Sequence, residues 1–313
     1  MGFGQWRWSC LVLAGVLGLA LAGRARAQVS VAIDGDTANA TISLPDGHGG
    51  TYDADVTIVF DSPENLTATS LNLTAEVIDP SDPVIADRLA PTCLTIVVLN
   101  YCPKVDPAFP VLVTVEPVDF PWLFTSGFED AESGDGDLLF HNSYHFEVHT
   151  HDLAYTDGSP YRLFKAPVGG NFHDVTNDVL AGSVRVRGRG GDFSQFLVVS
   201  DPRNSVLLGA QLVAAGKIVD LNLRILAAAL DEGLQLDLLG LLAQVDTLLL
   251  VDLVAAIDTL DQLIDLIDSN AGTNIANVWS AHHDVVNDAG ELAELAYTLR
   301  FSMTRMLGGT ANP

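Results

Sequence analysis

The stretch 141–151 holds side chains whose types and spacing could bind a transition-metal ion. It reads HNSYHFEVHTH, and in a β-strand every second side chain points to the same face of the sheet. The candidate ligands that would share one face are His145, Glu147, His149 and His151. Imidazole nitrogens and carboxylate oxygens bind Zn²⁺ and related ions. A metal site on this strand is therefore one hypothesis. The alternative is the ordinary polar face of an antiparallel strand whose aromatic face packs in the core.

The acidic, glycine-rich stretch 126–137 is a second candidate, for Ca²⁺. This ion takes several oxygen ligands, often from a flexible loop. The carboxylates that the stretch offers belong to Asp130, Glu132, Asp135 and Asp137. Their spacing does not match the EF-hand pattern. The alternative is a solvated loop, or a linker between two β-rich modules.

Three arginines, Arg185, Arg187 and Arg189, alternate along the chain before a glycine-rich turn. On a strand they would lie on one face, where they could bind an anionic glycan or pair with the protein's own acidic side chains. Because acidic residues greatly outnumber basic ones in this chain, we expect ion pairs across neighbouring strands.

Catalytic motifs that can be recognised by their spacing are absent from the sequence. It has no G-x-S-x-G nucleophile turn, no phosphate-binding P-loop and no G-x-G-x-x-G between a strand and a helix. We therefore predict no catalytic residues and favour a protein that is not an enzyme.

The first 27 residues have the pattern of a secretory signal peptide. Arg7 precedes an apolar run over 11–22, and Ala25-Arg26-Ala27 supplies the small residues needed for cleavage before Gln28. The run is too short to span a bilayer. We expect export to the periplasm or out of the cell, and a mature chain without a transmembrane segment.

Cys93 and Cys102 are the only cysteines after this segment. In an exported protein, two cysteines favour a disulfide over a metal site, which would need further ligands. The residues between them have the pattern of a strand, which would hold the two ends too far apart. We therefore predict a disulfide together with a sharp bend near Asn100-Tyr101.

The charge of the chain excludes one class of partner. Asp and Glu number 40 against 15 Lys and Arg, which gives a net charge of −25. Nucleic acids and anionic lipid surfaces are bound chiefly through Lys and Arg. We expect no nucleic-acid partner.

Two hydrophobic periods divide the rest of the chain. From 28 to 203, apolar and polar residues alternate in short runs separated by turn sequences, which predicts antiparallel strands in a β-sandwich. This region is either one unit or two modules, 28–125 and 138–203. From 206 to 307, apolar residues recur at helical spacing. We expect three long helices, over 205–232, 234–268 (broken near Gly240) and 273–307, in an antiparallel bundle.

Part of the β-rich region resembles a known kind of module. The stretches SPYRLFKAPV at 159–168, GSVRVR at 182–187 and FSQFLVVSD at 193–201 are similar to β-sandwich modules of exported bacterial proteins of unknown function. The resemblance covers at most residues 109–201. It implies an immunoglobulin-like fold and a bacterial source, and it transfers no catalytic residues because its motifs are structural.

Together these patterns predict an α+β multidomain protein, with an N-terminal immunoglobulin-like antiparallel β-sandwich region and a C-terminal antiparallel helical bundle. The favoured function is that of an exported, non-enzymatic binding or structural module for an unknown protein or glycan. One alternative is a metal-binding protein that uses the histidine-rich strand, with a transition metal or Ca²⁺ as the bound ion. The other is a protein whose apolar helices mediate oligomerisation or bind a partner.

Overall fold

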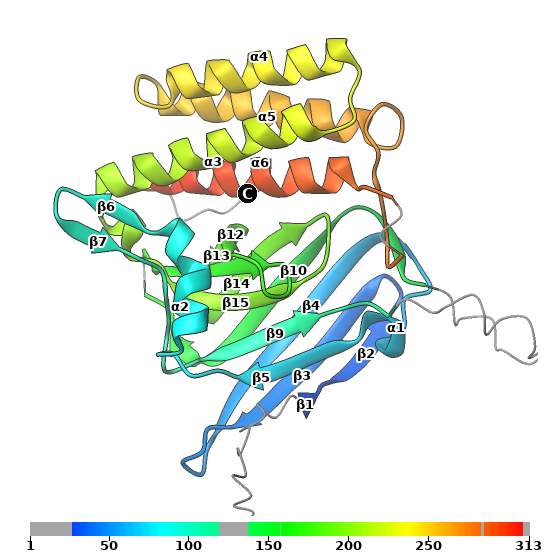
Figure 1. Cartoon of the computed structure of the whole chain (residues 1–313), viewed down its shortest axis with the longest axis vertical. Helices are drawn as coiled ribbons and strands as arrows, with labels where there is room; N and C mark the ends of the chain where they lie inside the picture. The colour runs from blue at the N-terminus through cyan, green and yellow to red at the C-terminus, as the bar shows by residue number, and fades with distance from the viewer. Residues whose placement is uncertain (1–26, 119–136, 157, 283–284, 309–313) are drawn as a thin grey trace, which may run out of the picture.

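The period-two alternation of the first two thirds of the chain produces antiparallel strands, and the helical period of the last third produces long helices (Figure 1). The structure is a computed structural model and describes residues 27–118, 137–156, 158–282 and 285–308. The predicted signal segment, apart from Ala27, lies outside the described residues. The predicted α+β class, with antiparallel sheets and mostly C-terminal helices, is confirmed.

One seven-stranded sheet has the order β13-β14-β10-β4-β3-β2, and β16 pairs with β10 at one end. Its strands are β2 (Ser30–Asp34), β3 (Thr37–Pro45), β4 (Thr51–Glu64), β10 (Leu139–Ala154), β13 (Thr176–Leu180), β14 (Ser183–Gly190) and β16 (Val278–Ser280). Buried and exposed residues alternate along β3. This sheet therefore has one face in the core and one face toward solvent, as the alternation predicts.

The second seven-stranded sheet has the order β1-β5-β9-β15-β11-β12, and β8 pairs with β15. Its strands are β1 (Ala27–Gln28), β5 (Leu73–Val77), β8 (Lys104–Val105), β9 (Val111–Val115), β11 (Tyr161–Ala166), β12 (His173–Asp174) and β15 (Gln195–Ser200). Every residue of β9 is buried. Both faces of this sheet are thus covered at its centre.

The two sheets share one hydrophobic core. Phe146 of β10 stacks on Phe196 of β15 with ring centroids 3.8 Å apart, and both rings belong to a single buried cluster with residues of the two sheets. Helix α2 (Pro83–Leu89) covers part of the opposite face of the second sheet, where Ile85 and Leu89 pack against Phe164 and Leu197. Strands from 28–125 and 138–203 pair with one another in both sheets, for example β4 with β10.

A disulfide joins Cys93 and Cys102, as predicted. These residues flank the hairpin of β6 (Leu94–Ile96) and β7 (Leu99–Tyr101). The predicted place of the bend is wrong: the chain turns at Val97-Val98, where Val97 adopts a φ of 61°. The turn lies at the midpoint between the cysteines, which lets the two short strands pair symmetrically.

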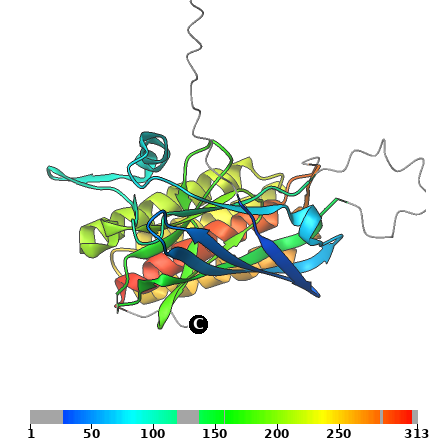
Figure 2. The same ribbon diagram turned by 90° about the horizontal axis from the view of Figure 1, so that it is seen from below.

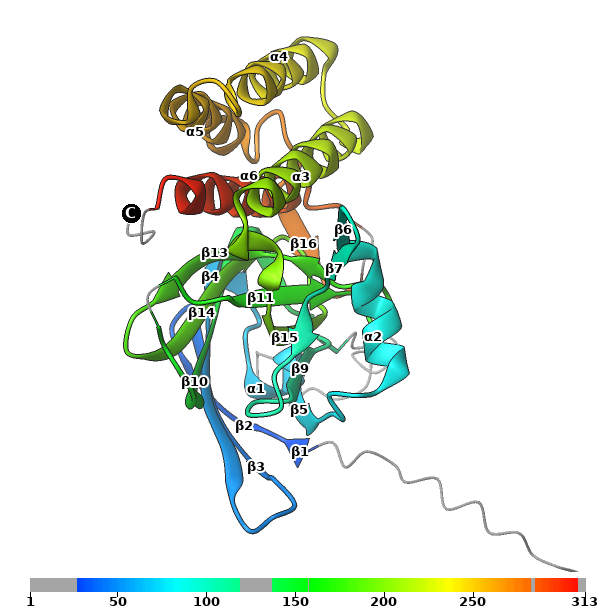
Figure 3. The same cartoon turned by 90° about the vertical axis from the view of Figure 1, so that its left-hand side faces the viewer.

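The described part of the chain has four long helices after β15, namely α3 (Leu207–Ala227), α4 (Glu232–Leu248), α5 (Leu253–Asn270) and α6 (Asp288–Met306), with β16 between α5 and α6. Figure 3 shows α3 and α6 next to the strands and α4 and α5 farther away. In the view from below, the strands lie in front of these helices (Figure 2). Helix α6 contacts β10, β13 and β14, so it is the helix that joins the helical region to the first sheet. A short helix, α1 (Ala68–Leu71), precedes β5.

The expected division into three helices is wrong. Gly240 lies within α4, and the break comes instead before Asp252, whose side chain accepts a hydrogen bond from the Ala255 backbone N–H at 3.1 Å and begins α5. The last helix begins 15 residues later than expected, after Asn287, whose side chain caps it. Trp279 of β16 instead packs into the core between the sheets. No helix of the described part is long and apolar enough to cross a membrane.

Candidate functional site

Three potential metal ligands converge on the solvent-facing side of the pair β4–β10. The register places His149 directly opposite Asp55, and His151 follows two residues later on the same face. Asp55 Oδ2 lies 3.8 Å from His149 Nδ1 and 3.5 Å from His151 Nε2. One ligand atom from each of the three side chains lies within 4.8 Å of the other two. The centroids of the imidazole rings are 4.4 Å apart.

The two separations from Asp55 Oδ2 are close to those around a small transition-metal ion. Bonds of about 2.0 Å in a tetrahedral arrangement place neighbouring ligand atoms about 3.3 Å apart. A shift of a few tenths of an ångström would bring Asp55 Oδ2 to that separation from both nitrogens. The side chains of His151 and Asp55 are 52% and 48% exposed, whereas that of His149 is 14% exposed. The site is therefore open on one side, where water could fill a remaining coordination position.

The atoms of these side chains that would not bind the ion have partners of their own. Thr41 Oγ1 donates a hydrogen bond to Asp55 Oδ1 at 3.0 Å, which leaves Oδ2 directed at the histidines. His149 Nε2 contacts the Ser183 hydroxyl. If Nε2 carries the ring proton, Nδ1 presents its lone pair toward Asp55. Such outer contacts orient the ligands of protein metal sites.

The protonation of His149 also suits a ligand. Burial lowers the pKa of His149 from its ordinary value, and the positive charge of Arg185 acts in the same direction, while Asp55 and Glu147 oppose the shift. The ring is therefore predominantly neutral at pH 7, and a neutral imidazole is the form that binds a metal ion.

The other two predicted ligands lie elsewhere along the strand. Glu147 forms an ion pair with Arg187 and lies 4.0 Å from Arg185 Nε. Desolvation and the charges of Arg189 and Arg187 lower the pKa of His145 to about 4. The prediction that all four side chains share one face is correct in parity. They do not form one ligand set, because Glu147 is engaged by Arg187 and Arg185 and His145 lies four residues, about 13 Å along the strand, from His149.

Asp55 is a candidate ligand that the sequence pattern does not reveal, because it lies on another strand. Its only signal in the sequence is the alternation of Asp53 and Asp55 with the apolar residues of a strand. That signal predicts a solvent-facing carboxylate but does not give its register against the histidines. The pairing of β4 with β10 supplies that information.

Three of the four residues in the predicted calcium set, Asp130, Glu132 and Asp135, lie outside the described residues. Asp137 is described, and its carboxylate contacts the ring of His282. Of the three arginines expected to form ion pairs across strands, Arg185 and Arg187 both pair with Glu147. The third arginine, Arg189, instead places its guanidinium 3.9 Å from the centroid of the Tyr297 ring of α6.

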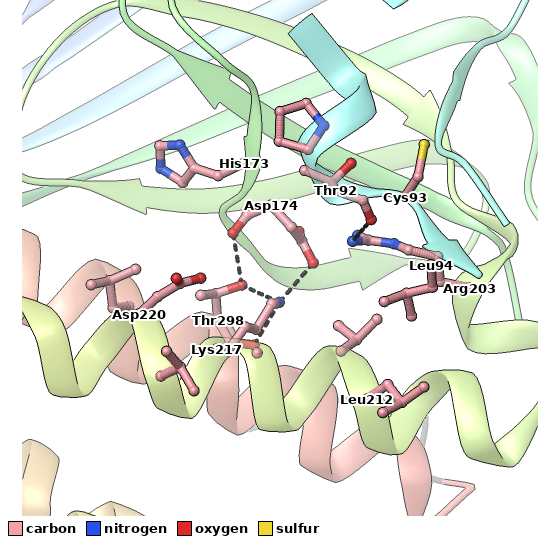
Figure 4. A pocket seen from close by; sticks show the side chains of 15 residues that line it. Thr92, Cys93, Leu94, His173, Asp174, Arg203, Leu212, Lys217, Asp220 and Thr298 are labelled. Carbon is pink, nitrogen blue, oxygen red and sulfur yellow. Dashed lines mark hydrogen bonds and ion pairs between the residues drawn. The ribbon is translucent and has the colours of Figure 1, made fainter. Parts of the chain in front are cut away.

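A pocket of about 360 Å³ lies between α3 and the disulfide hairpin. Figure 4 shows Lys217 of α3 reaching toward Asp174 of β12 at its base. The Lys217 ammonium donates to Asp174 Oδ2 at 2.6 Å, to Thr298 Oγ1 at 2.7 Å and to Ser302 Oγ at 2.9 Å. These bonds use the three donors of an ammonium group. Arg203 also lines this pocket, and its guanidinium donates hydrogen bonds to both carboxylate oxygens of Asp201.

The ionisable side chains next to this pocket likewise contact one another. His173 Nε2 lies 2.9 Å from Glu294 Oε1, and the other oxygen of Glu294 contacts Lys165. Since these groups satisfy one another, the pocket's polar wall serves the packing of helices on strands. Among the described residues, Asp55, His149 and His151 form a group of potential metal ligands whose ligand atoms all lie within 4.8 Å of one another.

No curated protein and no solved structure matches the chain. A family model, described as a family of unknown function (DUF6689), matches residues 15–307. The match spans both the strands and the helices described above, and the chain therefore belongs to the DUF6689 family.

Proposed function

We propose that this protein binds a transition-metal ion of the Zn²⁺ or Cu²⁺ type through Asp55, His149 and His151, without a catalytic role. The observation that carries the proposal is the convergence of three ligand atoms, from two neighbouring strands, within 4.8 Å. Two imidazoles and a carboxylate form a donor set that these ions favour. The contacts of Thr41 with Asp55 and of Ser183 with His149 support it further, because they hold the ligands in place.

The charge of the chain is consistent with this function. A net charge of −25 attracts cations toward the surface. General attraction does not select a transition metal over Ca²⁺ or Mg²⁺, which prefer oxygen ligands. The two imidazole nitrogens supply that selectivity.

The scaffold that we propose is an immunoglobulin-like β-sandwich carrying a helical bundle, in a protein exported through its first 27 residues. The shared core of the two sheets supports the sandwich, and a buried cluster made from all four long helices supports the bundle. The signal-like sequence of the N-terminus supports export. In this arrangement the metal site lies on the outer face of one sheet.

The proposal is tested by titrating Zn²⁺ and Cu²⁺ into the mature, untagged protein in competition with a chromophoric chelator. We expect one ion per chain. The variants His149→Ala, His151→Ala and Asp55→Asn should each weaken binding at least tenfold. His145→Ala removes an imidazole from the same strand and serves as the matched control, with unchanged affinity. Equal loss in the control, or no binding above the chelator background, would overturn the assignment.

A second variant tests whether the contacts around the ligands contribute to metal affinity. Thr41→Val removes the hydroxyl that holds Asp55 Oδ1 but leaves all three ligands. Loss of an outer contact of this kind costs about 10–100-fold in metal affinity. An unchanged affinity would indicate that the ligands bind the ion without this support.

A further inference from the structure

We propose that a small pocket beside Arg162 and Arg305, at the start of helix α3, binds an oxyanion group of the carboxylate, phosphate or sulfate class. The pocket has a volume of about 110 Å³, and its polar lining comes from Arg162, Arg305, Asn204, Ser205 and Asp201. It shares no residue with the metal site, so the inference does not rest on the proposed metal function.

Arg162 of β11 is the central observation. The residue is 1% exposed, and its guanidinium lies 5.1 Å from the centroid of the Phe301 ring. Its Nη1 donates to the carbonyl oxygens of Ser159 and Tyr161 at 2.9 and 2.6 Å. Its Nε is buried and has no hydrogen-bond partner among the described residues. A buried donor without an acceptor is destabilising. Arg162 lines the pocket, and an anion bound there would compensate the charge of its guanidinium group.

The charge of Arg162 is also uncompensated at close range. Among the described ranges, no carboxylate forms an ion pair with it. The nearest candidate on the pocket wall, Asp201, has both oxygens engaged by Arg203, at 2.9 Å from Nε and 2.8 Å from Nη2. Burial lowers the pKa of Arg162, and the carboxylates of Asp174 and Asp201 only partly oppose that shift. An arginine nevertheless stays protonated in proteins.

Arg305 adds a second positive charge from another element. It lies in the last turn of α6, lines the same pocket, and its charge acts electrostatically on Arg162. Two guanidinium groups that repel each other inside one pocket favour an anion between them. Guanidinium groups bind carboxylate and phosphate oxygens in a fixed, often bidentate geometry.

The start of helix α3 also favours an anion in this pocket. The residue before the helix, Val206, makes no side-chain capping hydrogen bond, so the first backbone N–H groups of this 21-residue helix are not capped by it. Such N–H groups, together with the helix dipole, favour an anion at a helix N-terminus. Ser205 and Ala210 bring this end of the helix to the pocket wall.

The size of the pocket limits the ligand. One water molecule needs roughly 10–15 Å³ of such space, so 110 Å³ holds a group of roughly seven to eleven heavy atoms at most. A free anion or the anionic end of a larger molecule would fit. The overall charge of −25 repels anions at long range, so binding depends on these local cations.

The test is calorimetric titration of metal-free, full-length mature protein with inorganic phosphate, sulfate and acetate at constant ionic strength. Arg305→Gln is the principal variant because its side chain is only partly buried. Arg300→Gln, on the same helix but paired with Asp261, is the matched control with the same change in charge. We expect one site. Its affinity should fall about tenfold or more in Arg305→Gln and be unchanged in Arg300→Gln.

The three probes also identify the class of oxyanion. Preference for phosphate and sulfate over acetate would assign a tetrahedral anion, and the reverse preference would assign a carboxylate; either supports the pocket. Absence of binding for all three probes would overturn the inference. Equal weakening in Arg305→Gln and Arg300→Gln would also overturn it, because it would show a general effect of charge. Arg162→Lys gives an independent check, since it keeps the charge but lacks the Nε donor.

Discussion

The Lys217 ammonium of α3 lies 2.6 Å from Oδ2 of Asp174 on β12, and both residues are buried. A second buried contact of the same kind joins Lys165 of β11 to Glu294 of α6. The chain contains only three lysines, and two of them lie in these pairs. The helical region is thus held to the strands by buried charges as well as by apolar packing.

The first prediction concerns the stability of this contact. Lys217→Met keeps the length of the side chain but leaves Asp174 as an uncompensated buried charge. Breaking a buried pair in this way costs about 3–5 kcal/mol. We expect a decrease of that size in the free energy of unfolding, measured by urea denaturation. Lys104→Met, an exposed position on β8, should change it by less than about 0.5 kcal/mol. A similar effect in both variants would contradict this account.

The second prediction concerns the stability of the folded protein at acidic pH. Burial would raise the pKa values of Glu294 and Asp174, but Lys165 and Lys217, respectively, outweigh it and lower each pKa to about 2. The folded protein then binds fewer protons than the unfolded chain between about pH 4.5 and 2. Stability contributed by the two ionised groups is present above that window and is lost as the pH falls through it.

Glu294→Gln tests this directly. The variant should be less stable than the parent protein at pH 7, and the difference should shrink as the pH falls below 4.5. The free energy of unfolding, measured at several pH values, gives the comparison. A difference that stays constant with pH would contradict the lowered pKa, because it would show that Glu294 has the same pKa in the folded and unfolded states.

The third prediction concerns His145, whose pKa is lowered to about 4 by desolvation and by Arg189 and Arg187. Between pH 6.5 and 4 the unfolded chain binds this proton and the folded protein does not, so stability falls as the pH falls through that window. After allowance for solvent screening, the loss is about 1–2 kcal/mol. His145→Gln should remove this part of the pH dependence, whereas His151→Gln should retain it. Identical profiles for the parent and His145→Gln would refute the assignment.

The strand pattern could be predicted from the sequence because it is local. The parity of β10 follows from the alternation of His145, Glu147 and His149 with aromatic and apolar residues. The partner of the histidines could not be predicted, since Asp55 lies about 95 residues earlier and only the β4–β10 register brings it to His149. The same limit applies to Lys165 and Glu294, which are 129 residues apart.

The predicted helix boundaries were wrong for a different reason. Two apolar helices joined by a short turn have nearly continuous helical periodicity, so α4 and α5 resemble one helix. The break depends on the cap that Asp252 provides, and an aspartate within a run of leucines is a weak signal by itself. Likewise, Trp279 has the apolar character expected of either a helix or a strand. Its place in β16 is decided by pairing with Phe140 of β10.

The central claim is that Asp55, His149 and His151 form a metal site. Its most direct test is the metal content of the protein, purified without chelator or histidine tag and measured by mass spectrometry beside the His149→Ala variant. We predict close to one Zn²⁺ or Cu²⁺ ion per chain in the parent protein and little in the variant. The absence of transition metal from the parent protein, even after incubation with these ions and removal of the excess, would contradict the claim.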